Sequence, residues 1–225
     1  MPEANYLNRI GNILRPARTI PRTSWTSSHR WKLTPKRLIV LVFGLSLFGF
    51  GEALLFNAGI GNSPWAVLAQ GVTRHSNLNV GEATFLISAI VLAIWFPLNE
   101  KPGLGTLANM VVIAVTFQLG VDYFPIVSIY ILQLLFVFSG IILIGVGSGF
   151  YITCGLGPGP RDGLMTALHQ KTGIRVGRVR TTLEVLVCLI GWALGGTIGI
   201  GTALFALLIG NSVALGFKFV SIFSK

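Results

Sequence analysis

The chain has 225 residues, of which 52% are hydrophobic and only 11% charged, and its mean hydropathy is +0.75. A soluble domain usually carries about a quarter charged residues, so this composition excludes a soluble fold and predicts an integral membrane protein. The net charge is +10, but the basic residues gather before the first apolar run and in the connections. That distribution is typical of cytoplasmic segments beside anionic lipid headgroups, and it argues against a nucleic-acid partner.

Residues 1–36 precede the first apolar run and are polar and basic, with several prolines and a single acidic residue, Glu3. We expect this segment to be a disordered cytosolic tail. The alternative is an organelle transit peptide, because such peptides are rich in Arg and Ser and poor in acids. A cleaved secretory signal is not expected, because the apolar run that follows is longer than the hydrophobic region of a signal peptide.

Six apolar runs follow in the chain, at residues 38–58, 82–98, 104–121, 127–153, 180–197 and 199–217. Each is near the length of about 17–25 residues that a helix needs to cross the hydrocarbon core. Lipid offers no partner to unpaired backbone groups, so we predict an all-α membrane protein with six transmembrane helices. If the basic tail is inside, the basic connection at 155–179 is also inside, and both termini are cytoplasmic.

The two halves of the chain are similar when the sequence is shifted by 96 residues. Residues 59–64 (GIGNSP) then align with 155–160 (GLGPGP), and residues 103–106 (GLGT) align with 199–202 (GIGT), without a gap between them. Shared glycine is common in membrane sequences, but an ungapped register that also pairs prolines is not. The pattern therefore indicates an internal duplication.

The duplication predicts two repeats of three helices each, at residues 37–121 and at 122–225, the second with a short C-terminal tail. Because three is an odd number, the second repeat enters the membrane from the opposite side. Such inverted repeats are characteristic of secondary transporters. The alternative is a duplicated scaffold that transports nothing.

In each half the first span ends in a G-x-G-x-x-P break. Glycine permits backbone conformations closed to other residues, and proline is suited to the first turn of a helix. We therefore predict a short half-helix after each break, either re-entrant or at the interface. Two such N-termini that face a protein-lined cavity favour an anionic or polar solute. The candidate solute-binding residues are Ser63, Pro64, Trp65, Pro160, Arg161 and Asp162. The alternative is an ordinary helix-loop-helix whose Arg161 and Asp162 meet headgroups or each other.

Two carboxylates lie within predicted spans, Glu52 in the first and Glu184 in the fifth. Ionisable residues inside a membrane usually serve function, so both are candidate coupling-ion or proton sites. For Glu52 the alternative is a carboxylate that neighbouring hydrogen bonds satisfy. For Glu184 the alternative is an ion pair with Arg180, one helical turn earlier.

Motifs of catalysis and metal binding are absent from the sequence. There is no H-E-x-x-H, C-x-x-C or G-x-S-x-G, and the glycine-rich breaks do not follow a strand as a dinucleotide fingerprint requires. The three histidines are scattered, and the two cysteines have no metal-ligand spacing. We therefore expect no enzymatic activity, no metal site and no cofactor.

Several segments are similar to a known family. The sequence GLGPGPRDGLMTAL, followed by TGIRVGRVRTTLEV and GGTIGIGTALFALLIG, resembles the bacterial YczE/YyaS/YitT-like membrane proteins, and GNSPWAVL in the first half fits the same pattern. The resemblance covers residues 38–217 and implies a bacterial multi-pass plasma-membrane protein. It implies no catalytic residue and no particular substrate.

Two functions remain open at this point. The first is a small secondary transporter or permease for a small polar or anionic solute. The second is an accessory or scaffold subunit of a larger membrane complex. The expected partner is a lipid bilayer with anionic headgroups. A homodimer and a further membrane-protein partner are both left open, and the sequence does not identify the substrate.

Overall fold

The computed structural model describes residues 20–224, so residues 1–19 and 225 lie outside the described part of the chain. Within it the protein consists of eight α-helices and one short 3-10 helix, with no strand. They are α2 (Pro35–Ala58), α3 (Pro64–Arg74), α4 (Val80–Ile94), η1 (Phe96–Leu98), α5 (Leu104–Tyr123), α6 (Tyr130–Thr153), α7 (Pro160–Thr172), α8 (Val176–Ala193) and α9 (Ile200–Phe223). The all-α prediction is confirmed for these residues.

Five of the predicted spans correspond to helices that are long and apolar enough to cross a membrane. They are Pro35–Ala58, Val80–Leu98, Leu104–Tyr123, Tyr130–Thr153 and Ile200–Phe223. The other predicted span corresponds to α8, which has 18 residues but carries Arg178, Arg180 and Glu184 in its first half. These charges separate α8 from the other five helices by composition, although its length is sufficient.

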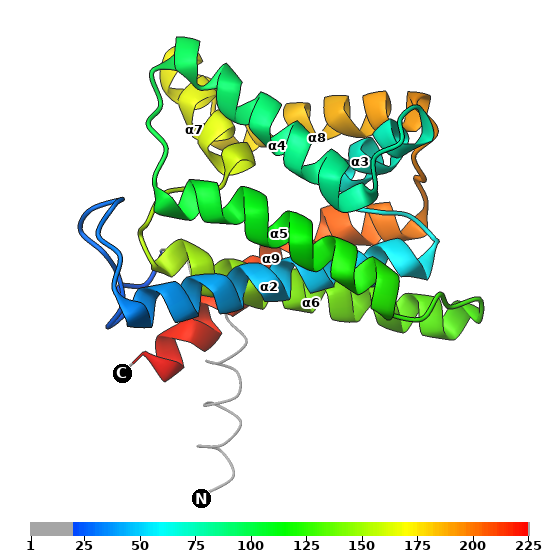
Figure 1. Ribbon diagram of the computed structural model, residues 1–225, viewed down its shortest axis with the longest axis horizontal. Coiled ribbons are helices and arrows are strands. Elements are labelled where there is room, and N and C mark those ends of the chain that lie inside the picture. Colours follow the sequence, from blue (N-terminus) through cyan, green and yellow to red (C-terminus); the bar gives the residue numbers. More distant parts are fainter. Residues whose placement is uncertain (1–19, 225) are drawn as a thin grey trace, which may run out of the picture.

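The helices are arranged in two groups, seen as lower and upper layers in Figure 1. In the lower layer α2 packs against α5 and α6, and α6 packs against α9. In the upper layer α3 packs against α4 and α8, and α7 packs against the same two helices. The contact between α4 and α5 joins the layers. When each helix is exchanged for the one about 96 residues away, the contacts within each layer are retained, whereas the α4–α5 contact has no comparable α8–α9 counterpart.

Helices α2 and α6 cross at glycines. A Cβ atom placed on Gly51 would lie 2.7 Å from the carbonyl oxygen of Gly140, and one placed on Gly140 would lie 2.6 Å from the carbonyl oxygen of Gly51. Gly44 and Gly147 face each other in the same way. The two pairs exchange under the shift of 96 residues. Only glycine allows backbones to approach so closely, which explains the glycines in these apolar runs.

The two breaks adopt left-handed backbone conformations, with φ of 120° at Gly61 and 111° at Gly157. Each break is fixed by a hydrogen bond to the start of another helix. The amide of Gly201 donates to the carbonyl oxygen of Ile60 at 2.9 Å, and the amide of Gly105 donates to the carbonyl oxygen of Leu156 at 2.8 Å. The short helices α3 and α7 then begin at prolines, so each break directs a helix N-terminus into the protein.

Residues 20–34, here called the strap, lie against the start of α2 and the end of α6. Trp25 is buried, and its indole Nε1 donates to the Thr153 hydroxyl at 3.1 Å. The guanidinium of Arg37 donates to three strap carbonyl oxygens. The amide of Leu104 donates to the carbonyl oxygen of Arg30, which brings the start of α5 to the same side. This packing of residues 20–34 differs from the disorder expected there, because the composition of a segment does not reveal tertiary contacts. Residues 1–19 of the expected tail lie outside the described residues.

The strap also covers Cys154, where the amide of Ser27 donates to the Cys154 carbonyl oxygen at 2.9 Å. The thiol is fully buried, and burial raises its pKa to about 12 despite the nearby positive charge of Arg37. Cys154 is therefore an inert packing residue and offers no nucleophile.

Candidate functional site

A cavity of about 110 Å³ lies inside the protein, lined by residues of α2, α3, α5, α6, α7, α8 and α9 and of the second break. It is somewhat smaller than a cavity of about 150 Å³, which accommodates a molecule the size of benzene. Five charged side chains line it: Glu52, Arg161, Asp162, Arg180 and Glu184. The cavity is therefore small and highly polar.

Glu52 is the most deeply buried of these charged residues, with 2% of its surface exposed. The hydroxyl of Ser63 donates to its Oε2 at 2.6 Å. Its Oε1 lies 3.9 Å from Nη1 of Arg161, which is a loose ion pair without a hydrogen bond. Ser63 also caps α3 by accepting from the amide of Ala66. Ser63, at the start of α3, thus fixes the position of the Glu52 carboxylate on α2.

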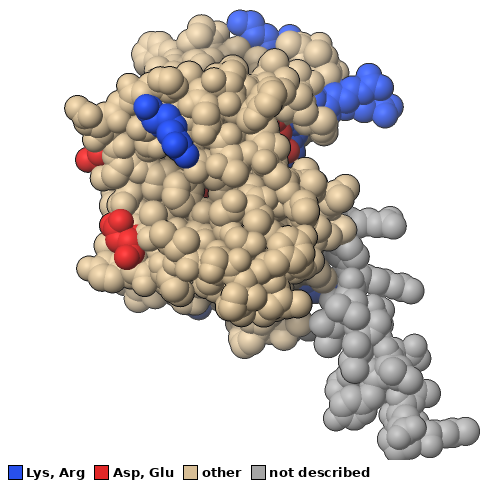
Figure 2. Space-filling view, turned by 90° about the vertical axis from the view of Figure 1, so that its right-hand side faces the viewer, with Lys and Arg blue, Asp and Glu red and all other residues tan. Residues whose placement is uncertain are grey.

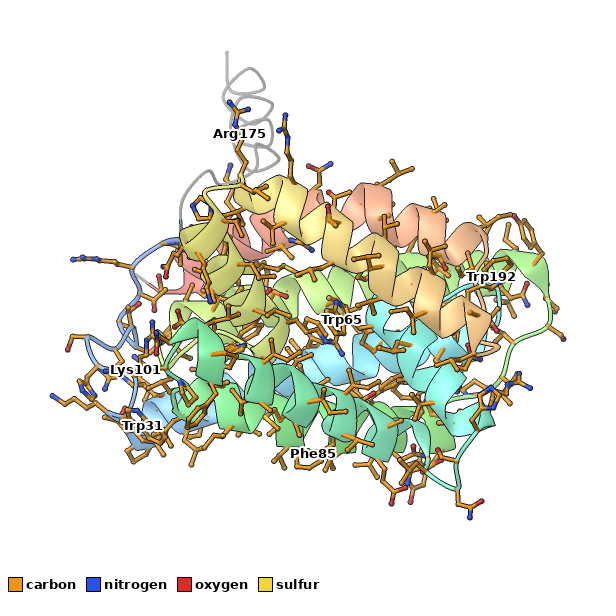
Figure 3. The ribbon with its side chains drawn as sticks, turned by 90° about the horizontal axis from the view of Figure 1, so that it is seen from above. Trp31, Trp65, Phe85, Lys101, Arg175 and Trp192 are labelled. Atoms are coloured by element: carbon orange, nitrogen blue, oxygen red, sulfur yellow. The ribbon has the colours of Figure 1, made fainter. Side chains whose placement is uncertain are left out.

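Arg161 lies at the start of α7, with its guanidinium carbon 5.0 Å from the centre of the Trp65 ring. This cation–π contact joins the second residue of α7 to the second residue of α3. Figure 3 shows Trp65 inside the molecule between the helices, whereas Arg175 and Lys101 lie at the periphery. The side chain of Arg161 is 21% exposed. Within the described part of the chain its guanidinium donates no hydrogen bond.

The other two carboxylates have close partners. The hydroxyl of Tyr151 donates to Oδ2 of Asp162 at 2.5 Å. Nε of Arg180 donates to Oε1 of Glu184 at 2.8 Å, which is the pairing that the sequence offered as the alternative for Glu184. Both carboxylates are therefore held in place by their neighbours.

Of the eight candidate residues from the sequence, six line the cavity: Ser63, Trp65, Arg161, Asp162, Glu52 and Glu184. Pro64 and Pro160 do not line it. They begin α3 and α7, and the carbonyl oxygen of Pro160 accepts from Nε1 of Trp95 at 3.0 Å. Both prolines therefore shape the backbone near the site without contributing to the cavity wall.

Sequence reasoning did not identify Tyr151 and Asn109 as cavity residues. Tyr151 lies one helical turn before the second break and places a hydroxyl at the end of an otherwise apolar run, which is a weak signal. Asn109 lies in α5 and contacts the second break at Gly159. Its position becomes apparent only when the two halves are packed together.

Both halves of the chain contribute equivalent positions to the cavity wall. Each first-half residue that lines it has its counterpart, 96 residues later, on the same wall: 48 and 144, 52 and 148, 63 and 159, 65 and 161, 109 and 205, and 113 and 209. The charges are nevertheless unequal, because Glu52 is the only charged residue that the first half supplies. The cavity thus lies where the halves meet, but its chemistry is asymmetric.

Metal binding finds no support within residues 20–224, where no group of three or more His, Cys, Asp or Glu side chains is placed to hold an ion. The charged groups of the cavity are instead arranged as neighbouring acids and bases. Such an arrangement suits recognition of a small polar molecule by hydrogen bonds and charge.

The apolar helices and the charged cavity between them define a multi-pass helical membrane protein. The chain belongs to a family described as a family of unknown function (DUF6198), whose profile matches residues 35–218. It is 41% identical over 199 residues to an uncharacterized protein of Haemophilus influenzae, covering 88% of this chain and 91% of that one.

Two proteins of Bacillus subtilis are also similar. The uncharacterized membrane protein YczE is 37% identical over 182 residues, which is 80% of this chain and 82% of YczE. The uncharacterized protein YyaS is 29% identical over 168 residues, or 72% of this chain and 82% of YyaS. The resemblance to the YczE and YyaS proteins is therefore confirmed. No solved structure matches the chain.

Proposed function

We propose that the protein is a small secondary transporter of the plasma membrane, which moves a small polar or anionic solute through the central cavity. The observation that carries this proposal is the charged cavity, whose wall is built from equivalent positions of both halves. Ionisable residues inside a membrane are costly and usually serve function. A cavity between two repeats is also where such transporters hold their substrates.

The proposal includes six spans in two inverted repeats, with α8 as the fifth span. The reciprocal glycine contacts between α2 and α6 and the matching hydrogen bonds at the two breaks support it. The charges of α8 do not oppose a membrane position, because Arg180 and Glu184 face the cavity and pair with each other. In this arrangement α3 and α7 are re-entrant helices that meet near the middle of the membrane.

The proposed orientation places both termini in the cytoplasm. The starts of α2 and α5 and the end of α6 meet at the basic strap, which is the side expected to be cytoplasmic. Figure 2 shows the face at the opposite ends of these helices, and few charged side chains appear on it. The basic residues gathered at the strap follow the positive-inside bias.

Transport in such a molecule would proceed by a small rotation of one repeat against the other around the glycine crossing of α2 and α6. Glycine contacts place few side chains in the way of such a movement. The charged groups would stay with the cavity while access to it changes from one side to the other. No enzymatic step is needed for this function.

A second candidate is favoured by the way the protein itself satisfies two of the carboxylates, since Asp162 accepts from Tyr151 and Glu184 accepts from Arg180. Internal pairs of this kind also stabilise a rigid scaffold, and an accessory subunit of a membrane complex would need no solute. In that case the protein would copurify with a stoichiometric partner in mild detergent and would move no solute in liposomes.

The test begins with a screen of metabolites for thermal stabilisation of the purified full chain, followed by flux of the best ligand in liposomes. We expect Glu52→Gln to abolish coupled flux, because it removes the buried carboxylate beside Arg161. Glu82→Gln is the matched control, because Glu82 caps α4 outside the cavity and glutamine retains that cap. Equal flux in Glu52→Gln and wild type would remove Glu52 from the mechanism.

A further inference from the structure

The hydrogen bonds of the charged side chains indicate which kind of solute the cavity accepts. Each of the three carboxylates already accepts a hydrogen bond from a neighbouring side chain. A cationic solute would have to compete with these donors. The side chain of the cavity that still has hydrogen bonds to offer is a donor, not an acceptor.

That donor is Arg161. Its guanidinium carries five N–H groups, and within residues 20–224 none of them donates a hydrogen bond. The contact with Trp65 holds the planar group in position without using its N–H groups. A planar carboxylate is the natural complement of a guanidinium, since the two can form paired hydrogen bonds. The site therefore favours a solute that carries a carboxylate.

The net charge of the site then indicates whether a proton must bind together with this anion. Glu52, which is 2% exposed, and its partner Arg161 together have a formal net charge of zero. Asp162 is exposed and the Arg180 side chain is 41% exposed, so solvent screens the charges of these two groups. A monoanion bound to Arg161 would bring the net charge at this buried pair to −1, and uncompensated charge in a buried site is strongly unfavourable. One proton taken up with each anion restores the original charge.

Glu52 is the most suitable of the three carboxylates to take up this proton. Asp162 is held by Tyr151, and Glu184 is held by the full charge of Arg180. The carboxylate of Glu52 instead lies 3.9 Å from the guanidinium of Arg161 and forms no hydrogen bond with it. A solute carboxylate that binds this guanidinium would therefore deprive Glu52 of its cationic neighbour. The lining residues of α5 and α9 include no ionisable side chain, and the one that α6 contributes, Tyr151, donates its hydroxyl to Asp162.

We propose that a small monocarboxylate replaces Glu52 as the partner of Arg161, and that Glu52 takes up one proton as this happens. The carboxylate of Glu52 becomes a neutral carboxylic acid, Arg161 stays protonated, and release of the solute reverses both changes. This inference rests on the proposed transport function and specifies its solute class and its coupling. One anion and one proton would cross together, so transport would carry no net charge.

The experiment uses the full chain in detergent, with acetate, glycolate and lactate as probes. Calorimetric titration in two buffers of different ionisation enthalpy gives the number of protons taken up for each anion bound. For wild type we expect about one proton per anion. For Glu52→Gln we expect binding without proton uptake, and Glu82→Gln should behave as wild type.

Arg161→Lys tests whether the guanidinium binds the solute carboxylate, because lysine keeps the positive charge but lacks the planar pair of N–H donors. We expect binding of all three probes to weaken about tenfold or more. A thermal unfolding curve for each variant shows that it is folded. Undiminished binding in Arg161→Lys, or unchanged proton uptake in Glu52→Gln, would overturn the proposal, as would the absence of binding of any probe to wild type.

Failure of this inference can be distinguished from failure of the proposed function. If the metabolite screen finds a neutral or cationic solute whose flux depends on the cavity, the protein is a transporter and the proton–carboxylate coupling is wrong. If an anion crosses without a proton, the same conclusion follows. If no solute moves in liposomes, the transport function and this inference both fail.

Discussion

At the scale of the residue, Ser63 connects local structure with the site. Its hydroxyl accepts a hydrogen bond from the amide of Ala66 in the first turn of α3, and it donates a hydrogen bond to the carboxylate of Glu52. The equivalent position in the second half is Gly159, which offers no side-chain cap. The first half therefore keeps a donor for a buried acid that the second half does not have. The two positions, 96 residues apart, therefore have different roles around one cavity.

Ser63→Ala should destabilise the folded protein by about 1–3 kcal/mol, since it removes a helix cap and leaves a buried carboxylate without its close donor. The matched control is Ser148→Ala, at the position equivalent to Glu52. Ser148 lines the same cavity, and its hydroxyl makes no hydrogen bond within residues 20–224. Thermal unfolding in detergent measures both. If the two variants unfold alike, Ser63 does not support Glu52.

At the scale of the element, the sequence predicts the long helices and the two breaks because lipid imposes length and apolar composition on each span. It does not predict the pairing of Tyr151 with Asp162 or the position of Arg161 over Trp65, because these depend on how separate helices pack. The strap shows the same limit. Its basic composition is typical of a disordered tail, whereas its order depends on Trp25 reaching Thr153 far along the chain.

The crossing of α2 and α6 gives the prediction at this scale. In Gly51→Ala the new methyl group would lie 2.7 Å from the carbonyl oxygen of Gly140 and 3.0 Å from the amide nitrogen of Ile144, and both of these are backbone atoms. Overpacking of this kind should destabilise the protein by about 1–3 kcal/mol.

The control for this variant is Gly210→Ala in α9, where a Cβ atom meets nothing within 4 Å. In a helix with free space, alanine should be neutral or stabilising by up to about 1 kcal/mol. Denaturation of both variants in the same detergent gives the comparison. A tolerated Gly51→Ala would show that the crossing is looser than described.

At the scale of the whole molecule, the proposed inverted repeat makes the connections after α3 and α7 lie on opposite sides of the membrane. The reason is that α4 and α8 occupy equivalent places in the two repeats but would run in opposite directions across the bilayer. Ser76 follows α3 and Thr172 ends α7, and both side chains are exposed. They are therefore suitable positions for labels that report the side directly.

In a background with Cys154→Ser and Cys188→Ser, single variants Ser76→Cys and Thr172→Cys should react differently with a membrane-impermeant maleimide. We expect Ser76→Cys to be labelled on intact cells and Thr172→Cys to be labelled only after the membrane is opened. Labelling of both on the same side would exclude the inverted arrangement. The cavity could then no longer lie between repeats of opposite orientation, and alternating access through it would have no structural basis.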